Sequence, residues 1–191
     1  MKEYLFSEFM KLTEELVKLK NNDLQDKTEA IKLNFVRMKR IYGNTVVSEK
    51  LAQCLSNLKI PLKWVVISEP WCGDSAQILP ILAKIAESTA NIELKIVLRD
   101  ENSEFMDNHL TNGTRSIPKL ICYNQTNDKQ VGEWGPRPKL IMDFVSDYKK
   151  THPILDKKEF NYHLHHLYGK DNGKAIQEDT LIFLKSITET T

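Results

Sequence analysis

The sequence predicts an α/β fold: four strands and three helices in the order β-α-β-α-β-β-α, between helical segments at both ends of the chain. Three observations support this prediction. Apolar runs of strand length alternate with amphipathic helical patterns from residue 63 to residue 149. The last two strand patterns are separated only by turn-forming residues 124–128, which indicates an antiparallel hairpin. Outside this central stretch the apolar residues recur with helical spacing alone.

Three helices are predicted before the first strand. Leu5 to Leu19 carry an apolar stripe at helical spacing, which Asn21-Asn22-Asp23 ends. The stripe from Ile31 to Tyr42 stops at Gly43-Asn44, and a third, short helix covers Ser48 to Leu58. Core packing is the favoured interpretation of these stripes, and a coiled-coil dimer is the alternative.

The central elements follow from the same kind of pattern. The apolar run Trp64-Val65-Val66-Ile67 indicates a strand that is buried on both faces. The other central elements are predicted as a helix at 73–88, a strand at 92–98, a short helix at 102–110, strands at 117–123 and 129–134, and a helix at 139–149. Leu140, Phe144 and Tyr148, which are four residues apart, predict the apolar face of this last helix.

The C-terminal tail predicts two further helices, at 157–168 and 174–186. All connections between elements are short, which favours one compact domain. Within it we expect a helical extension at 1–58, a core at 59–150, and a C-terminal helical extension at 151–191 that packs on the core.

Composition and charge narrow the class of protein. Of the 191 residues, 41% are hydrophobic and 28% are charged, so the chain has enough apolar material for a core. The 27 Lys and Arg residues balance the 26 Asp and Glu residues without long blocks of either sign. We therefore expect no nucleic-acid partner and no membrane-surface partner. No apolar run approaches the ~20 residues of a membrane span, and Glu residues interrupt the N-terminal segment where a secretory signal would be apolar.

The cysteine count indicates a reducing compartment. Cys54, Cys72 and Cys122 are an odd number, and their spacing fits neither a disulfide framework nor a four-cysteine zinc site. We therefore expect a cytoplasmic protein with no metal and no other cofactor.

The stretch around Cys72 carries the most chemical information. Cys72 follows a buried strand and precedes a helix, so unpaired backbone N–H groups and the helix dipole favour a thiolate there. Gly73 lets the backbone of a partner approach closely. A cysteine in this position is a candidate nucleophile towards disulfides.

This stretch resembles the active-site loop of the thioredoxin family. Trp71, Cys72 and Gly73 match the family's Trp-Cys-Gly, and Pro80 follows the cysteine at the family's distance. Independently, residues 114–120 resemble the family segment that places a cis-proline opposite the catalytic cysteine.

The resemblance covers about residues 60–149 and implies a thioredoxin-like fold, in which a mixed four-stranded sheet is flanked by helices. The extensions at both ends are similar to those of an elaborated bacterial thioredoxin-like subfamily. The catalytic residues that the resemblance implies are Cys72 and Ser75. The substrate-binding residues that it implies are Trp71, Gly73, Asp74, Ile117, Pro118 and Arg137.

The departures from the family pattern change the expected chemistry. Thioredoxins carry Cys-Gly-Pro-Cys, whereas this chain has Cys72-Gly73-Asp74-Ser75, so the resolving cysteine is absent. Ser75 can still donate a hydrogen bond to a thiolate, while the charge of Asp74 raises the pKa of the thiol. The buried acid that thioredoxins use as a proton shuttle is replaced by Val66. Cys54 and Cys122 are interpreted as buried, inert packing residues.

Two other groups of residues are considered. Arg137 lies in a Gly-Pro-Arg-Pro loop, where thioredoxins place a loop beside the active site, and it can meet an acidic ligand or Asp74. His163, His165 and His166 are interpreted as solvated, because at most two of them share a helix face and no other zinc ligand stands at a suitable spacing.

We expect a monothiol thioredoxin-like oxidoreductase. Cys72 attacks the disulfide of a protein or small-molecule client, and an external thiol, for example one of low molecular weight, resolves the mixed disulfide. The alternative is a redox-inactive binding module for a protein client. A third hypothesis, an iron–sulfur carrier similar to monothiol glutaredoxins, is disfavoured by Asp74.

Overall fold

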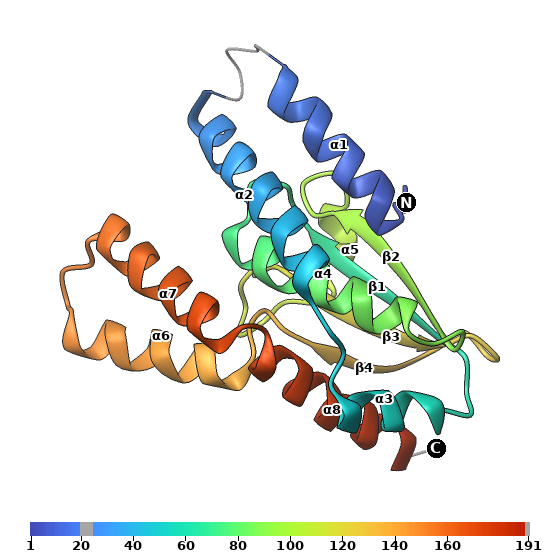
Figure 1. Cartoon of the computed structure of the whole chain (residues 1–191). Coiled ribbons are helices and arrows are strands. Elements are labelled where there is room, and N and C mark those ends of the chain that lie inside the picture. Colours follow the sequence, from blue (N-terminus) through green and yellow to red (C-terminus); the bar gives the residue numbers. More distant parts are fainter. Residues whose placement is uncertain (20–24, 190–191) are drawn as a thin grey trace.

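The computed structural model describes residues 1–19 and 25–189 (Figure 1). The predicted helix end at Asn21-Asn22-Asp23 lies outside the described residues. The described helices are α1 (Phe6–Lys18), α2 (Gln25–Asn44), α3 (Glu49–Ser56), α4 (Gly73–Glu87), α5 (Ser103–Asp107), α6 (Lys139–Thr151), α7 (Lys157–Asp171) and α8 (Lys174–Glu189). The strands are β1 (Leu62–Ser68), β2 (Ile92–Leu98), β3 (Lys119–Asn124) and β4 (Lys129–Trp134).

The four strands form one mixed sheet in the order β2-β1-β3-β4. β1 runs parallel to β2, and α4 supplies the crossover that such a pair requires. β3 is antiparallel to both of its neighbours, β1 and β4. The predicted α/β class, the mixed sheet and the β3–β4 hairpin are therefore confirmed.

Both faces of the sheet are covered. Because side chains alternate along a strand, Trp64 and Val66 of β1 enter one core cluster, while Val65 and Ile67 enter the other. The first cluster is the larger and includes the apolar side chains of α4. The second is covered more thinly and includes Met106 of α5 and Cys72. Cys72 therefore packs on the thinly covered side, at the end of β1.

The extensions surround the first face (Figure 1). α2 packs along α4, and α1 packs on α2. α8 packs against α3 and β4, and Gly132 makes room for it, since a Cβ there would lie 2.8 Å from the ring of Phe183. α6 and α7 lie side by side as an arm, in which Phe144 stacks on Phe160.

Several helices differ from their predicted form. In α6 the residues that enter the core are Ile141 and Val145, while Leu140 is 44% exposed. Phe144 and Tyr148, the other members of the predicted stripe, pack against Phe160 of α7. The helix therefore has two apolar faces, because it contacts both the core and a neighbouring helix.

Three helix boundaries or faces also shift. α1 buries Phe6, Phe9 and Thr13, while Leu5 and Leu19 at the ends of the predicted stripe are 46% and 48% exposed. α5 is shorter than predicted. α7 continues past Gly169 to Asp171 and ends where Asn172 adopts a left-handed conformation, with φ of 55°. No described helix is long and apolar enough to cross a lipid bilayer.

Candidate functional site

Cys72 occupies the predicted position between β1 and α4. It is the N-cap residue of α4, and its Sγ accepts a hydrogen bond from the backbone N–H of Ser75 at 3.5 Å. The thiol also lies 3.5 Å from the carbonyl oxygen of Ile117, to which it donates. The peptide bond between Ile117 and Pro118 is cis. The two segments that carry the family resemblance therefore meet at the sulfur of Cys72, a residue that is 9% exposed.

Ser75 stands behind the thiol rather than on the surface. The residue is 1% exposed, and within the described part of the chain its hydroxyl has no hydrogen-bond partner. A buried hydroxyl without a partner loses about 1–3 kcal/mol of solvation. The hydroxyl nevertheless lies close enough to Cys72 to lower the pKa of the thiol. An ionised sulfur would give this hydroxyl the acceptor that it lacks.

Asp74 is held by two side chains from distant parts of the chain. Arg137 donates from Nε and Nη2 to the same carboxylate oxygen, Oδ2, at 3.0 and 2.6 Å. The hydroxyl of Tyr168 in α7 donates to the other oxygen, Oδ1, at 2.8 Å. Burial lowers the pKa of Arg137, but the hydrogen bond and charge of Asp74 outweigh it and raise the pKa overall. The sequence suggested two partners for Arg137, an acidic ligand and Asp74, and in the structure Arg137 contacts Asp74.

The pKa of the Cys72 thiol is raised, not lowered. Burial is the largest cause, and the negative charge of Asp74 is the second. The hydroxyl and N–H of Ser75 and the N–H of Asp74 act in the opposite direction without reversing the result. The expectation that the helix start alone would favour a thiolate is therefore wrong, because the sulfur is too deeply buried for the N–H groups to offset the lost solvation.

Trp71 lies beside the thiol as a half-buried platform. Its ring is flanked by the ammonium of Lys27, 4.6 Å from the ring centroid, and by the guanidinium of Arg99 at 4.7 Å. Cations over an indole face are held by the ring quadrupole. The neighbouring Glu69 is 7% exposed and accepts a hydrogen bond from the backbone N–H of Asp100, and burial raises its pKa. These contacts fix the Trp71 loop to α2 and to the end of β2.

The interpretation of His165 as a solvated histidine is wrong, because its ring is partly buried at the wall of the site. Its ring lies against Gly73, where a Cβ would be 3.0 Å from both Cε1 and Nε2. Its Nδ1 is 3.1 Å from the amide nitrogen of Gln77, one turn further along α4. Burial, with a contribution from the charge of Arg37, lowers the pKa of His165 to about 4. His165 is thus a neutral part of the site wall, and Gly73 makes room for it.

The N-terminal extension also reaches the site. Asn34 of α2 is 2% exposed and donates from Nδ2 to the carbonyl of Pro70 at 3.0 Å, so it fixes the loop that carries Trp71. Arg37, one turn later, donates to Asn34 Oδ1 at 2.8 Å, and the charge of Asp74 acts on it without a direct ion pair among the described residues. A polar residue at the centre of an apolar helix face was the only sequence signal for Asn34, and His165 had no such signal.

The other two cysteines lie elsewhere. Burial raises the pKa of Cys122 to about 12, and this residue belongs to the core cluster on the sheet face opposite to that of Cys72. Cys54 in α3 is partly buried, and burial raises its pKa as well. Across residues 1–19 and 25–189, no group of three His, Cys, Asp or Glu side chains is arranged to hold a metal ion.

Comparisons with known proteins bear on this site. The family model described as Thioredoxin matches residues 21–149, which is more than half of the chain. The match begins well before residue 60, so it includes α2 and α3 as well as the segment that carries the resemblance. No curated protein matches the sequence.

Two solved structures share the fold along nearly the whole chain. One is a protein of unknown function from Pseudomonas aeruginosa, with 17% identity, a TM-score of 0.58, and coverage of 98% of this chain and 99% of that one. The other is an HIV epitope scaffold with 18% identity, a TM-score of 0.56, and the same coverage of both chains. At these identities the likeness shows the fold alone, and it extends to the helices on both sides of the sheet.

Proposed function

The chain belongs to the thioredoxin family, and from this premise we propose that it exchanges thiols and disulfides through a single thiol, that of Cys72. One observation carries the proposal. The Cys72 sulfur lies 3.5 Å from both the N–H of Ser75 and the carbonyl of Ile117, between the start of α4 and the cis peptide bond. This is the arrangement in which a substrate disulfide can lie along the Ile117 backbone and meet the sulfur.

The reaction has two steps and is redox-neutral overall. The Cys72 thiolate attacks one sulfur of a client disulfide, a new S–S bond forms, and the other client sulfur leaves as a thiolate that takes up a proton. An external thiolate then attacks the client sulfur of the mixed disulfide, so Cys72 leaves as a thiolate and a new disulfide joins the external thiol to the client. Ser75 cannot perform this second step, so the co-substrate comes from outside the chain.

The raised pKa of Cys72 sets how this reaction responds to pH. At neutral pH the resting form is the thiol, and Asp74 stabilises that form. The hydroxyl of Ser75 is the group that gains a hydrogen bond when the sulfur ionises. The rate of mixed-disulfide formation therefore rises with pH through and above the ordinary range of a cysteine, about 8.5.

A redox-inactive binding module is the second candidate, and the same pKa favours it. In that case a client binds the surface of Trp71 and Pro118, and the buried thiol of Cys72 is only a packing residue. The two candidates share their surface and differ in whether the sulfur reacts.

Turnover of a small disulfide distinguishes the two. The full-length protein is mixed with hydroxyethyl disulfide and an excess of a low-molecular-weight thiol, and the formation of 2-mercaptoethanol is followed by chromatography. We expect catalysis above the uncatalysed exchange, its loss in Cys72→Ala, and its retention in Cys54→Ala. Wild-type rates equal to those of Cys72→Ala, with a normal circular dichroism spectrum, would reject the enzyme and leave the binding module.

The compartment follows from the chemistry that is proposed. Resolution by an outside thiol needs a pool of reduced thiol, which the cytoplasm supplies. We therefore include a cytoplasmic location in the proposal.

A further inference from the structure

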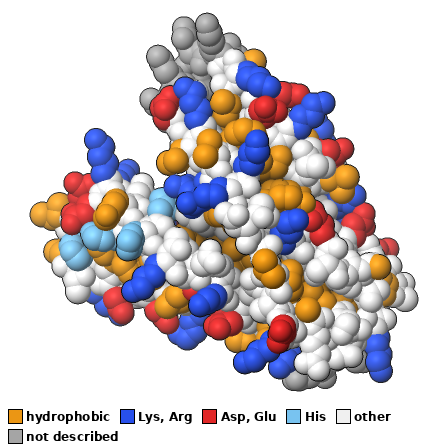
Figure 2. All heavy atoms as spheres, in the orientation of Figure 1, with side chains coloured by type: hydrophobic (Ala, Val, Ile, Leu, Met, Phe, Trp, Pro, Cys, Tyr) orange, Lys and Arg blue, Asp and Glu red, His pale blue; other side chains and the backbone are white. Residues whose placement is uncertain are grey.

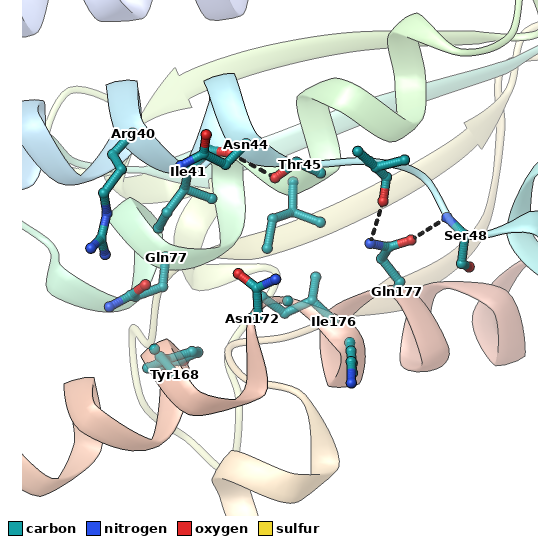
Figure 3. Close-up of a pocket in the computed structure, with 15 residues that line it drawn as sticks. Arg40, Ile41, Asn44, Thr45, Ser48, Gln77, Tyr168, Asn172, Ile176 and Gln177 are labelled. Carbon is teal, nitrogen blue, oxygen red and sulfur yellow. Dashed lines mark hydrogen bonds between the residues drawn. The ribbon is translucent and has the colours of Figure 1, made fainter.

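A pocket of about 460 Å³ lies behind the Cys72 site, where α2 ends and α7 turns into α8 (Figure 3). α4 forms its inner wall with Gln77 and Ile81, and Tyr168 separates it from the carboxylate of Asp74. Its size is in the usual range of small-molecule sites. The pocket is therefore a neighbour of the thiol site and is built largely by the extensions.

The pocket combines an apolar floor with a cationic rim. Ile81 and Ile176 provide apolar surface, and the side-chain amide of Gln177 is held in place, since it donates to the Val46 carbonyl and accepts from the Ser48 N–H. Arg40 and Lys174 stand on the rim from α2 and from the start of α8. No Asp or Glu is among the described residues that line it.

The donors of the rim are unused. Arg40, Asn44, Asn172 and Lys174 line the pocket, and within residues 1–19 and 25–189 none of their side chains makes a hydrogen bond or an ion pair. Figure 3 shows Arg40 extending from α2 towards the part of the pocket where Gln77 and Tyr168 lie.

Arg37 increases the positive potential at this position. It lies one helical turn before Arg40 on the same face of α2, and its only hydrogen-bond partner in the described chain is the neutral amide of Asn34. Burial, and then the charge of Arg40, lowers the pKa of Arg37. Figure 2 shows Lys and Arg side chains together in the notch between the α6–α7 arm and the end of α2. An anion bound at Arg40 would offset the repulsion between the two guanidinium groups.

The donor set favours a carboxylate over a phosphate. Phosphate sites at helix starts use free backbone N–H groups, but at the start of α8 the N–H of Ala175 is already bound to the carboxylate of Asp171, at 3.1 and 3.2 Å. The dipole of α8 is also opposed by that of α2, whose C-terminal end lies at the same pocket. Among the side chains that line the pocket, the Arg40 guanidinium is a planar fork that fits a carboxylate with two parallel hydrogen bonds.

We propose that this pocket binds a small molecule that carries carboxylate groups on a short carbon skeleton, with Arg40 and Lys174 as its charge partners and Ile81 and Ile176 under its carbon atoms. This site is separate from the thiol chemistry and does not require that Cys72 reacts.

The test uses calorimetric titration of the full-length protein with citrate, glutarate and inorganic phosphate at constant ionic strength. We expect saturable binding of at least one of the two carboxylates. Arg40→Gln and Lys174→Gln should each weaken it by about tenfold, the effect of about 1.4 kcal/mol. Lys39→Gln is the matched control, because it removes the same charge one residue away, at the pocket between α1 and α4.

Each other outcome overturns the proposal. Absence of saturation by both carboxylates up to about 10 mM excludes a useful site. Equal weakening by Lys39→Gln shows general charge attraction instead of a pocket. Phosphate binding as tight as that of the carboxylates, with the same dependence on Arg40, rejects the assignment of ligand class. The titration is repeated with Cys72→Ala. Unchanged affinity for the carboxylate in this variant would show that binding does not depend on the thiol of Cys72.

Discussion

Replacing Asp74 by Asn should make Cys72 a faster nucleophile. Asp74 is the second cause of the raised pKa of the Cys72 thiol, and its side chain is 11% exposed. Its charge is partly offset by Arg137, and Asn keeps the shape of the side chain while removing the charge. The change also leaves the Arg137 guanidinium without its anion, and a free cation near sulfur stabilises a thiolate.

The size of the effect follows from the Coulomb interaction. Like charges on neighbouring side chains, about 7 Å apart at an effective dielectric constant of about 20, repel by roughly 2 kcal/mol. The ion pair with Arg137 and access of solvent reduce this to about 1.4 kcal/mol, a tenfold gain in thiolate below the pKa. A more stable thiolate is also a weaker nucleophile, with a Brønsted coefficient of about 0.4–0.5, so the exchange rate rises by about threefold at pH 7.

The assay measures the reaction rate of Cys72 with an aromatic disulfide between pH 6 and 10, with the labelled cysteine identified by mass spectrometry. Arg137→Gln should have the opposite effect and slow the reaction, because Asp74 then acts without its counter-ion. Asp147→Asn, in the exposed pair with Lys150 of α6, is the control for loss of one negative charge. An unchanged or slower rate in a folded Asp74→Asn protein would refute the reasoning, since the charge would then have no effect at the sulfur.

Four further results are expected. The Ser75→Cys variant should form a disulfide with Cys72 under mild oxidation, seen as the loss of two hydrogens by mass spectrometry, and failure in a folded protein would contradict the placement of residue 75 behind the thiol. Gly73→Ala should lower the free energy of unfolding by about 1–2 kcal/mol, because the added Cβ would contact the His165 ring too closely. In a double-mutant cycle followed by urea titration, His165→Ala should remove most of this loss of stability. Because the pKa of His165 is lowered to about 4 in the folded protein, the unfolded state binds the proton first as pH falls below 6.5. The free energy of unfolding of the wild type should therefore fall by up to about 3 kcal/mol more than that of His165→Gln between pH 6.5 and 4. Equal pH dependence of the two free energies would count against a buried neutral ring. Cys122, with its pKa raised to about 12, should stay unlabelled by iodoacetamide at pH 9 in the folded protein, whereas labelling as fast as that of Cys72 would show that the sheet opens.

Much of the fold could be predicted because strands and helices impose different apolar periods. β2 was predicted at its observed bounds, and the hairpin of β3 and β4 followed from the turn residues between them. The faces of α6 and α1 were less predictable. A stripe such as Leu140, Phe144 and Tyr148 shows that a helix is amphipathic, but it does not show whether the sheet or α7 lies against it.

The position of the site was also readable from the sequence, because its parts are local. Two motifs with the spacing of the thioredoxin family contain Cys72, Ser75 and Pro118. Asp74 was one of the two partners predicted for Arg137. Asn34 and Tyr168 were not found, and His165 was interpreted as solvated, since each contacts the site from a helix that is remote in sequence and lies in no motif.

The sequence by itself determined the class of fold, the position of the thiol and the replacement of the resolving cysteine by Ser75, because these depend on residue types and on spacing within short segments. Only the tertiary structure decided the ionisation of Cys72, the partner of Asp74, and the cationic pocket behind the site. The physical reason is that desolvation and Coulomb interactions depend on distances through space, and those distances are set by how the two helical extensions pack on the sheet.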